Sequence, residues 1–102
     1  MDKVVRDGRV AVVYSPGFGA GWYTWNTEHP ELVFDPNIVQ YVIDKDWTKL
    51  KTYMALKYPE AYLGGMEDLE VTWIREGSLF RIDDYDGNES VVLQNEDNWM
   101  IA

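Results

Sequence analysis

The fold is decided by two adjoining sequences, the apolar run VAVVY at residues 10–14 and the loop SPGFGAGWYTWN at residues 15–26. In the apolar run, Val10 and Val12 alternate with Ala11 and Val13, so an extended strand is apolar on both of its faces. Strands of this kind are covered on both sides. We therefore predict a strand over residues 9–14 in the middle of a sheet.

The loop after this strand is rich in glycine and in aromatic residues. Glycine permits a sharp turn or a close approach that a side chain would block, and aromatic rings beside such a loop serve as core, lid or binding platform. We expect this loop to bind a ligand or a partner, while packing of two of its rings into the core is the structural alternative. The residues proposed to bind are Ser15, Gly17, Phe18, Gly19, Gly21, Trp22, Tyr23, Trp25 and Asn26.

Two adjacent helices are predicted in the middle of the chain. The first begins at Asp35-Pro36, an N-cap acceptor followed by proline at the first helical position, and ends near Asp44. The second is capped by Asp46 and ends just before Pro59. Apolar residues recur at helical spacing in both, which predicts one buried face for each helix.

From residue 69 the apolar period changes to two, which indicates strands. The predicted strands lie at residues 69–73, 80–83, 91–93 and 99–101. Asp86-Gly87 is a strong signal for a tight hairpin. The sequence therefore predicts one α+β domain over residues 1–102. Its mostly antiparallel sheet has four to five strands and carries a two-helix layer on one face, in the order β-loop-α-α-β-β-β.

Composition limits the classes of function. The chain has 102 residues, 46% of them hydrophobic, which suffices for one core, and it has no cysteine, which excludes disulfides and thiolate metal sites. No apolar run approaches the ~20 residues of a membrane span, and the N-terminus lacks the apolar segment of a signal peptide. We therefore expect a protein of the bacterial cytoplasm that does not contact a membrane.

The net charge of −9 is concentrated in the second half of the chain. Residues 1–59 carry seven acids and seven bases, whereas residues 60–102 carry eleven acids and two arginines. Such a half repels phosphate backbones, so we expect no direct binding of nucleic acid. It is suited instead to imitating a nucleic acid in the basic groove of another protein, although a merely solvated acidic surface is the plainer alternative. The residues proposed for this surface, within residues 83–97, are Asp83, Asp84, Asp86 and Glu89.

Motifs for phosphate binding, metal binding and catalysis are incomplete in this sequence. The loop lacks the Lys-Ser/Thr of a phosphate-binding loop, and its glycine spacing differs from the dinucleotide fingerprint. The stretch from Asp84 resembles a calcium-binding EF-hand loop, but Glu89 stands where glycine is required and Asn95 replaces the final glutamate. His29 is the only histidine, and Ser15 lacks a nucleophile-elbow motif. We predict no catalytic residue, no metal and no cofactor, and a protein that is not an enzyme.

Three segments carry a resemblance to other proteins: VVYSPGFGAGW at residues 12–22, FDP at residues 34–36 and YDGNES at residues 85–90. Together they resemble a group of small, functionally uncharacterised proteins carried by bacteriophages and by bacterial genomes, often in prophage regions. The resemblance spans nearly the whole chain and brings no catalytic residues with it. It implies a phage accessory protein that acts on a host or on a defence system.

Two functions follow as hypotheses. The first is a non-enzymatic binding protein whose loop at residues 15–26 holds a small ligand, such as a nucleotide, or a partner. The second is an interaction module that docks its acidic half on a basic host or defence protein and inhibits it. Aromatic residues make up 15% of the chain, more than one small core requires, so a homodimer is a further hypothesis.

Overall fold

Strand β2 (Arg9–Tyr14) is the middle strand of a three-stranded antiparallel sheet in the computed structural model, which describes residues 2–17 and 21–93. Its neighbours are β1 (Val5–Arg6) and β3 (Glu70–Arg75), and in the β2–β3 register Val10 lies opposite Ile74. The residues from Ala11 to Val13 are fully buried. The prediction of a central strand covered on both faces is confirmed.

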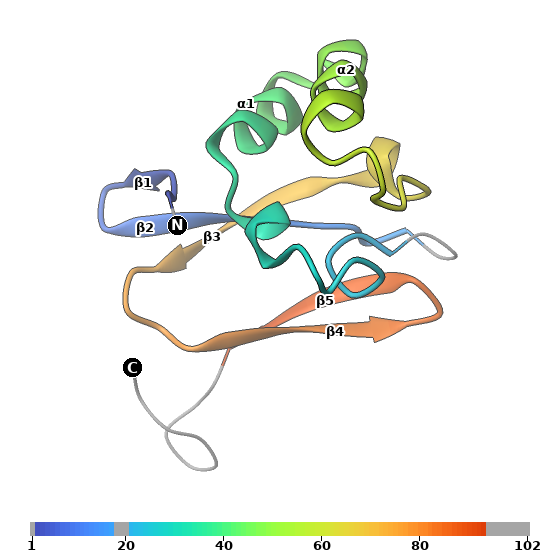
Figure 1. The fold of residues 1–102 in the computed structure, drawn as a ribbon. Helices are drawn as coiled ribbons and strands as arrows, with labels where there is room; N and C mark the ends of the chain where they lie inside the picture. Colours follow the sequence, from blue (N-terminus) through green and yellow to red (C-terminus); the bar gives the residue numbers. More distant parts are fainter. Residues whose placement is uncertain (1, 18–20, 94–102) are drawn as a thin grey trace.

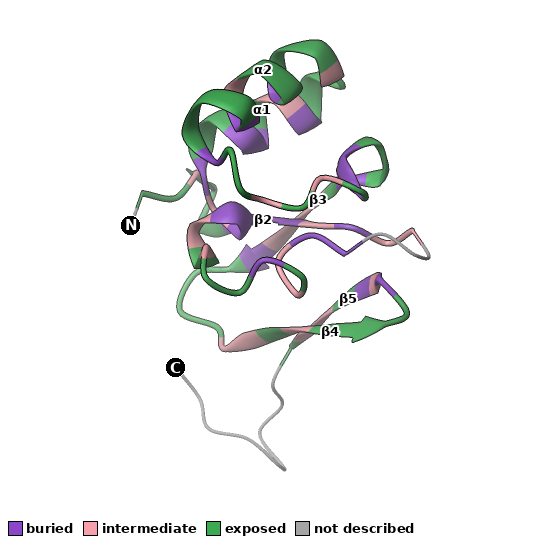
Figure 2. Ribbon diagram, turned by 45° about the vertical axis from the view of Figure 1, so that its right-hand side comes forward, coloured by how far each residue is buried: buried purple, intermediate pink, exposed green. Residues whose placement is uncertain are grey.

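Helices α1 (Pro36–Asp44) and α2 (Trp47–Lys57) cover one face of this sheet (Figure 1). Both begin at the predicted caps: the Asp35 carboxylate accepts hydrogen bonds from the first backbone N–H groups of α1, and that of Asp46 accepts one from the Lys49 N–H of α2. The buried residues of the two helices lie on the sides that face the sheet (Figure 2). The two-helix layer is therefore confirmed.

A hairpin of β4 (Phe80–Tyr85) and β5 (Asn88–Leu93) covers the other face as a separate two-stranded sheet (Figure 1). Its turn is the predicted Asp86-Gly87, with φ of 52° and 84°, as a two-residue hairpin turn requires. The prediction of one sheet is thereby corrected to five strands in two sheets. The physical reason is that β2 is apolar on both faces, so the apolar side of the hairpin packs over the face that the helices leave open.

Two hydrophobic clusters result, one on each side of the three-stranded sheet. The helix-side core contains Ala11 and Val13 of β2 with residues of both helices, and Trp22 belongs to it. The hairpin-side core is smaller: its buried members are Val12, Val33 and Ile74, and half-buried Tyr23, Phe34, Phe80, Ile82 and Val91 pack against them. Strand β2 thus contributes to both cores.

The remaining described elements are short. Strand β1 has two residues, and two 3-10 helices, η1 (Pro30–Val33) and η2 (Met66–Asp68), lie in the connections. None of these three was predicted, because elements of two to four residues carry too little periodicity. The strand predicted at residues 99–101 lies outside the described residues.

Candidate functional site

The aromatic residues of the loop at residues 15–26 lie in different environments. Trp22 is fully buried in the helix-side core, and its indole Nε1–H donates to the carbonyl oxygen of Leu32 at 3.1 Å. Tyr23 is half-buried against the hairpin-side core, whereas Trp25 is 40% exposed. The loop therefore uses Trp22 and Tyr23 for packing and leaves Trp25 at the surface.

The carboxylate of Glu89 lies inside this loop, although Glu89 belongs to β5. The residue is 1% exposed. Its Oε1 accepts a hydrogen bond from the Ser15 N–H at 2.9 Å. Its Oε2 accepts from the Trp22 N–H at 3.0 Å, and from the N–H and the hydroxyl of Thr24 at 2.8 and 2.6 Å. The loop thus presents N–H groups to an anion, and that anion is a side chain of the same protein.

Asn26 fastens the other end of the loop. Its Nδ2–H groups donate to the carbonyl oxygens of Trp22 at 2.7 Å and Tyr62 at 3.0 Å, and its Oδ1 accepts from the Tyr62 N–H at 2.7 Å. The side chain is 1% exposed. Since each of these bonds joins the Asn26 side-chain amide to a backbone group, Asn26 fixes the loop against the segment that carries Tyr62.

An exposed surface forms where the loop, this segment and the hairpin meet. The rings of Trp25 and Tyr62 have centroids 5.0 Å apart at an angle of 42°, and Trp25 Nε1–H donates to Asp84 Oδ2 at 2.9 Å. Gly21 lies against the indole: a Cβ there would overlap the Trp25 ring, so only glycine allows this approach. We name Trp25, Tyr62 and Asp84 the aromatic–acidic patch.

The acids of the hairpin do not share one surface. Asp84 belongs to the patch, whereas Asp83 faces the opposite side of β4, as alternate residues of a strand do, and lies 2.8 Å from the Nε of Arg81. Asp86 is exposed in the turn. Glu89 is buried against the loop, so the acidic surface predicted with it is corrected to exclude Glu89.

Several other residues predicted to bind serve the loop itself. Ser15 is fully buried, and its N–H and carbonyl oxygen both bond to Glu89. Gly17 lies against the side chain of Asp68. Phe18 and Gly19 lie outside the described residues. Of the predicted binding residues that the structure describes, Trp25 has the most exposed large side chain.

Asp35 is a second buried carboxylate, 3% exposed, at the start of α1. Its Oδ2 accepts hydrogen bonds from the hydroxyls of Tyr53 and Tyr58, at 2.6 and 2.9 Å, and from the ammonium group of Lys57 at 3.1 Å. Because Oδ1 caps α1, this carboxylate joins the start of α1 to the end of α2. Only the cap was predicted from the sequence. The signal for the other three hydrogen bonds is the spacing of Tyr53, Lys57 and Tyr58, which lie along one side at the end of α2.

These contacts shift the pKa values of Asp35, Lys57 and Tyr58. Burial by itself would raise the pKa of Asp35, but hydrogen bonds, first those from Tyr53 and Tyr58, outweigh burial, and the pKa lies below its ordinary value. Hydrogen bonds to Tyr53 and Asp35 raise the pKa of Lys57, and burial followed by the hydrogen bond to Asp35 raises that of Tyr58. All three shifts favour the protonation states present at neutral pH, which is the behaviour of a structural ion pair.

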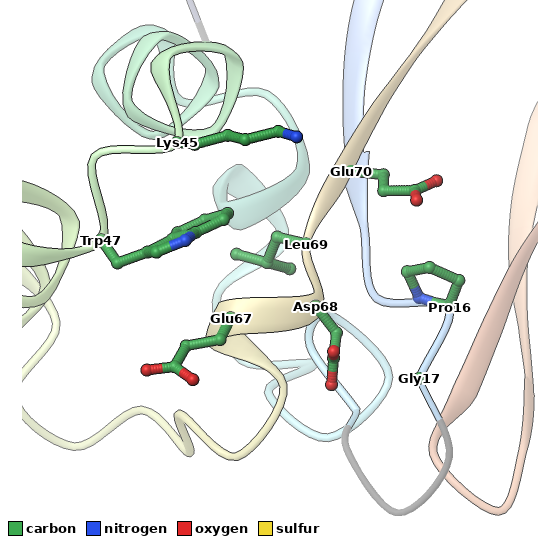
Figure 3. Close-up of a pocket in the computed structure, with 8 residues that line it drawn as sticks. All are labelled: Pro16, Gly17, Lys45, Trp47, Glu67, Asp68, Leu69 and Glu70. Atoms are coloured by element: carbon green, nitrogen blue, oxygen red, sulfur yellow. The ribbon is translucent and has the colours of Figure 1, made fainter.

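An open depression of about 470 Å³ lies beside the start of the loop (Figure 3). Its walls come from Pro16-Gly17, from Lys45 and Trp47 at the corner between the helices, and from residues 67–70. Trp47 and Leu69 point toward each other, whereas the carboxylates of Glu67 and Asp68 point away from the ammonium group of Lys45 (Figure 3). In the part of the chain that the structure describes, no three His, Cys, Asp or Glu side chains are placed to hold a metal ion.

Among the described residues, no helix has the length and apolar character needed to cross a membrane. Comparison of the chain with protein-family models, with curated proteins and with solved structures finds no match. The phage setting and the cytoplasmic location therefore stay predictions. What the site could bind is inferred from its geometry.

Proposed function

We propose that this chain is a non-enzymatic binding protein and that the aromatic–acidic patch is its contact surface. The observation that carries the proposal is the 2.9 Å hydrogen bond from Trp25 Nε1 to Asp84. This bond joins the glycine-aromatic loop and the acidic hairpin, which the sequence suggested as separate sites, in one surface. Trp25 and Tyr62 are 40% and 45% exposed, so both rings are accessible to a partner.

The chemistry of the patch fits a basic side chain. A guanidinium or ammonium group is attracted to the face of an aromatic ring and pairs with a carboxylate beside it. Across residues 60–93, eight acids and two arginines are exposed, which attracts a positively charged surface from a distance. We infer a partner protein that exposes arginine or lysine, such as the nucleic-acid-binding groove of a host or defence protein.

A nucleotide is the weaker candidate for this surface. Trp22 is buried, which leaves the rings of Trp25 and Tyr62 for stacking a base. The carboxylate of Asp84 beside them repels a phosphate group. A basic partner does not need the buried Trp22 ring, and the Asp84 carboxylate attracts it.

The proposal is tested with a fluorescently labelled octa-arginine peptide, whose binding is followed by anisotropy in 0.15 M NaCl. Asp84→Asn and Asp83→Asn form a matched pair, because they remove the same charge at adjacent positions on opposite faces of β4. We expect Asp84→Asn and Trp25→Ala each to weaken binding about fivefold, and Asp83→Asn less than about twofold, since Asp83 lies outside the patch.

Two other results would count against the proposal. Equal weakening by both aspartate variants, with no effect of Trp25→Ala, would mean that net charge alone attracts the peptide. Quenching of tryptophan fluorescence by ATP that is lost in Trp25→Ala would identify a nucleotide ligand instead. A folded state of each variant is established first from its near-UV circular dichroism.

A further inference from the structure

The charge balance of the buried Glu89 carboxylate is unusual. Among the described residues, no lysine, arginine or histidine forms an ion pair with it. Its charge is met instead by N–H groups of Ser15, Trp22 and Thr24 and by the Thr24 hydroxyl. Hydrogen bonds to an ionised acceptor are stronger than neutral ones, and here they replace the water that burial removes.

The donors are arranged for an acceptor with two oxygens. One oxygen of Glu89 meets the Ser15 N–H at the end of β2, and the other meets the Trp22 and Thr24 donors further along the loop. The donors thus converge from two segments on a flat group with an oxygen on either side. A carboxylate has this shape, and the donors belong to the loop whatever molecule supplies the carboxylate.

An open depression of the surface adjoins the segment of β5 that carries Glu89. This depression of about 350 Å³ lies where β2 and β3 meet β5, and the residues that line it include Glu89, Tyr14, Thr72 and Ser90. Removing the Glu89 side chain would leave the loop donors without their acceptor, close to a depression that solvent reaches.

We propose that the loop donors form a carboxylate-binding site whose built-in occupant is Glu89, and that a small carboxylate from solution occupies it when the Glu89 side chain is removed. The folded shape of the loop then depends on an anion at this point and not on its glycines alone. The inference is independent of the proposed function, because its test measures stability and involves no partner of the patch.

The test is chemical rescue of Glu89→Ala by sodium formate. The melting temperature of this variant in sodium chloride should lie about 10 °C or more below that of the unsubstituted protein, because the donors lose their acceptor. Formate at equal ionic strength should raise it by about 5 °C once formate reaches ten times its dissociation constant. The unsubstituted protein should not respond, since its site is filled.

Two controls separate binding from general stabilisation by the salt. Val39→Ala destabilises the protein by leaving a space in the helix-side core, where apolar side chains and no loop N–H donors line it. Formate should therefore leave the melting temperature of this variant unchanged. Glu89→Gln fills the site with an amide whose NH₂ faces N–H donors, so it should be destabilised yet respond little to formate.

The proposal is overturned if Glu89→Ala melts within about 2 °C of the unsubstituted protein, or if formate shifts it no more than it shifts Val39→Ala. Should Glu89→Ala be unfolded in chloride at 20 °C, the readout becomes the near-UV circular dichroism spectrum. Recovery of the folded spectrum of Glu89→Ala in formate supports the site. If this spectrum does not recover in 1 M formate although Glu89→Gln is folded, the site is refuted.

Discussion

At the scale of single residues, Asp35 couples the ends of two helices through one oxygen atom. Its Oδ2 receives the hydroxyl groups of Tyr53 and Tyr58 and the ammonium group of Lys57. An ammonium group that is 53% exposed contributes little as an ion pair, because water screens it. The buried hydrogen bonds from the two tyrosines therefore account for most of the stabilisation.

The first prediction concerns pH. The pKa of Asp35 is lower in the folded state than its unfolded value of about 4, so its contribution is present above that value and is lost as pH falls below it. The pKa values of Lys57 and Tyr58 are raised, so their contributions are present below about pH 10 and are lost as pH rises further. The free energy of unfolding should thus form a plateau between about pH 5 and 9.

The measurement is urea unfolding from pH 2.5 to 11, with Asp35→Asn as the comparison. Asp35→Asn should be less stable by about 2 kcal/mol at pH 6, and this difference should shrink toward pH 2.5 as the carboxyl group of the unsubstituted protein takes up a proton. A difference that stays constant from pH 6 to 2.5 would mean that the charge of Asp35 contributes nothing.

The two buried carboxylates show how far residue-level prediction from sequence extends. The cap at Asp35 was predictable because its acceptor and its first donors are neighbours in the chain. The burial of Glu89 was not predictable, because its donors lie 65 to 74 residues away and glutamate is rarely buried without a partner. Its place in the acidic stretch at residues 83–89 indicated an exposed side chain.

At the scale of elements, the layers on the two faces of the central sheet are unequal. The helix-side core has twelve buried residues among those described, and the hairpin-side core has three. Strands β4 and β5 pair only with each other among the described strands, and a backbone hydrogen bond from Glu89 to Ser15 joins them to the end of β2. The hairpin is therefore the layer with less buried apolar surface.

The second prediction is that the hairpin opens before the rest of the fold. Backbone amides of β4 and β5 should exchange with deuterium at least about tenfold faster than those of β2 paired with β3, because less apolar area is exposed when the hairpin opens. Ile82→Ala should widen this difference, because it removes apolar contacts that hold the hairpin, whereas the amides of β2 stay paired with β3. Equal protection in both sheets would mean a single cooperative unit.

Element prediction from sequence succeeded where the signals were local. Caps, the proline stop and the Asp-Gly turn all depend on residues next to one another, and both helices and the β4–β5 hairpin followed from them. The division into two sheets arises because the chain crosses after β3 to the other face of the central sheet and forms β4 and β5 there. Packing against both faces of β2 determines this crossing, and the periodicity of the sequence does not reveal it.

At the scale of the whole molecule, the two cores account for many of the aromatic residues. Trp22 and Tyr58 are buried in the helix-side core, and half-buried Trp47, Tyr53 and Trp73 pack against it. The excess of rings that motivated a homodimer is therefore smaller than the sequence suggested. A homodimer stays a prediction, and light scattering at micromolar concentration tests it.

The third prediction follows from the uneven charge of the molecule. A net charge of −9, with eight exposed acids against two arginines across residues 60–93, means that the second half repels itself in the folded state. Salt screens this repulsion over a Debye length of about 10 Å at 0.1 M. Raising NaCl from 20 mM to 0.3 M should therefore raise the melting temperature by about 3 °C.

Two exposed glutamates give the matched comparison, because Glu28 lies in the half with balanced charge and Glu60 in the acidic half. At 20 mM NaCl, Glu60→Gln should raise the melting temperature by about 1 °C more than Glu28→Gln, and this advantage should disappear at 0.3 M, because it arises from screened repulsion. A melting temperature that falls as NaCl is added would mean that attractive ion pairs outweigh the repulsion. In that case the exposed acids would already be compensated, and their attraction for a basic partner would be correspondingly weak.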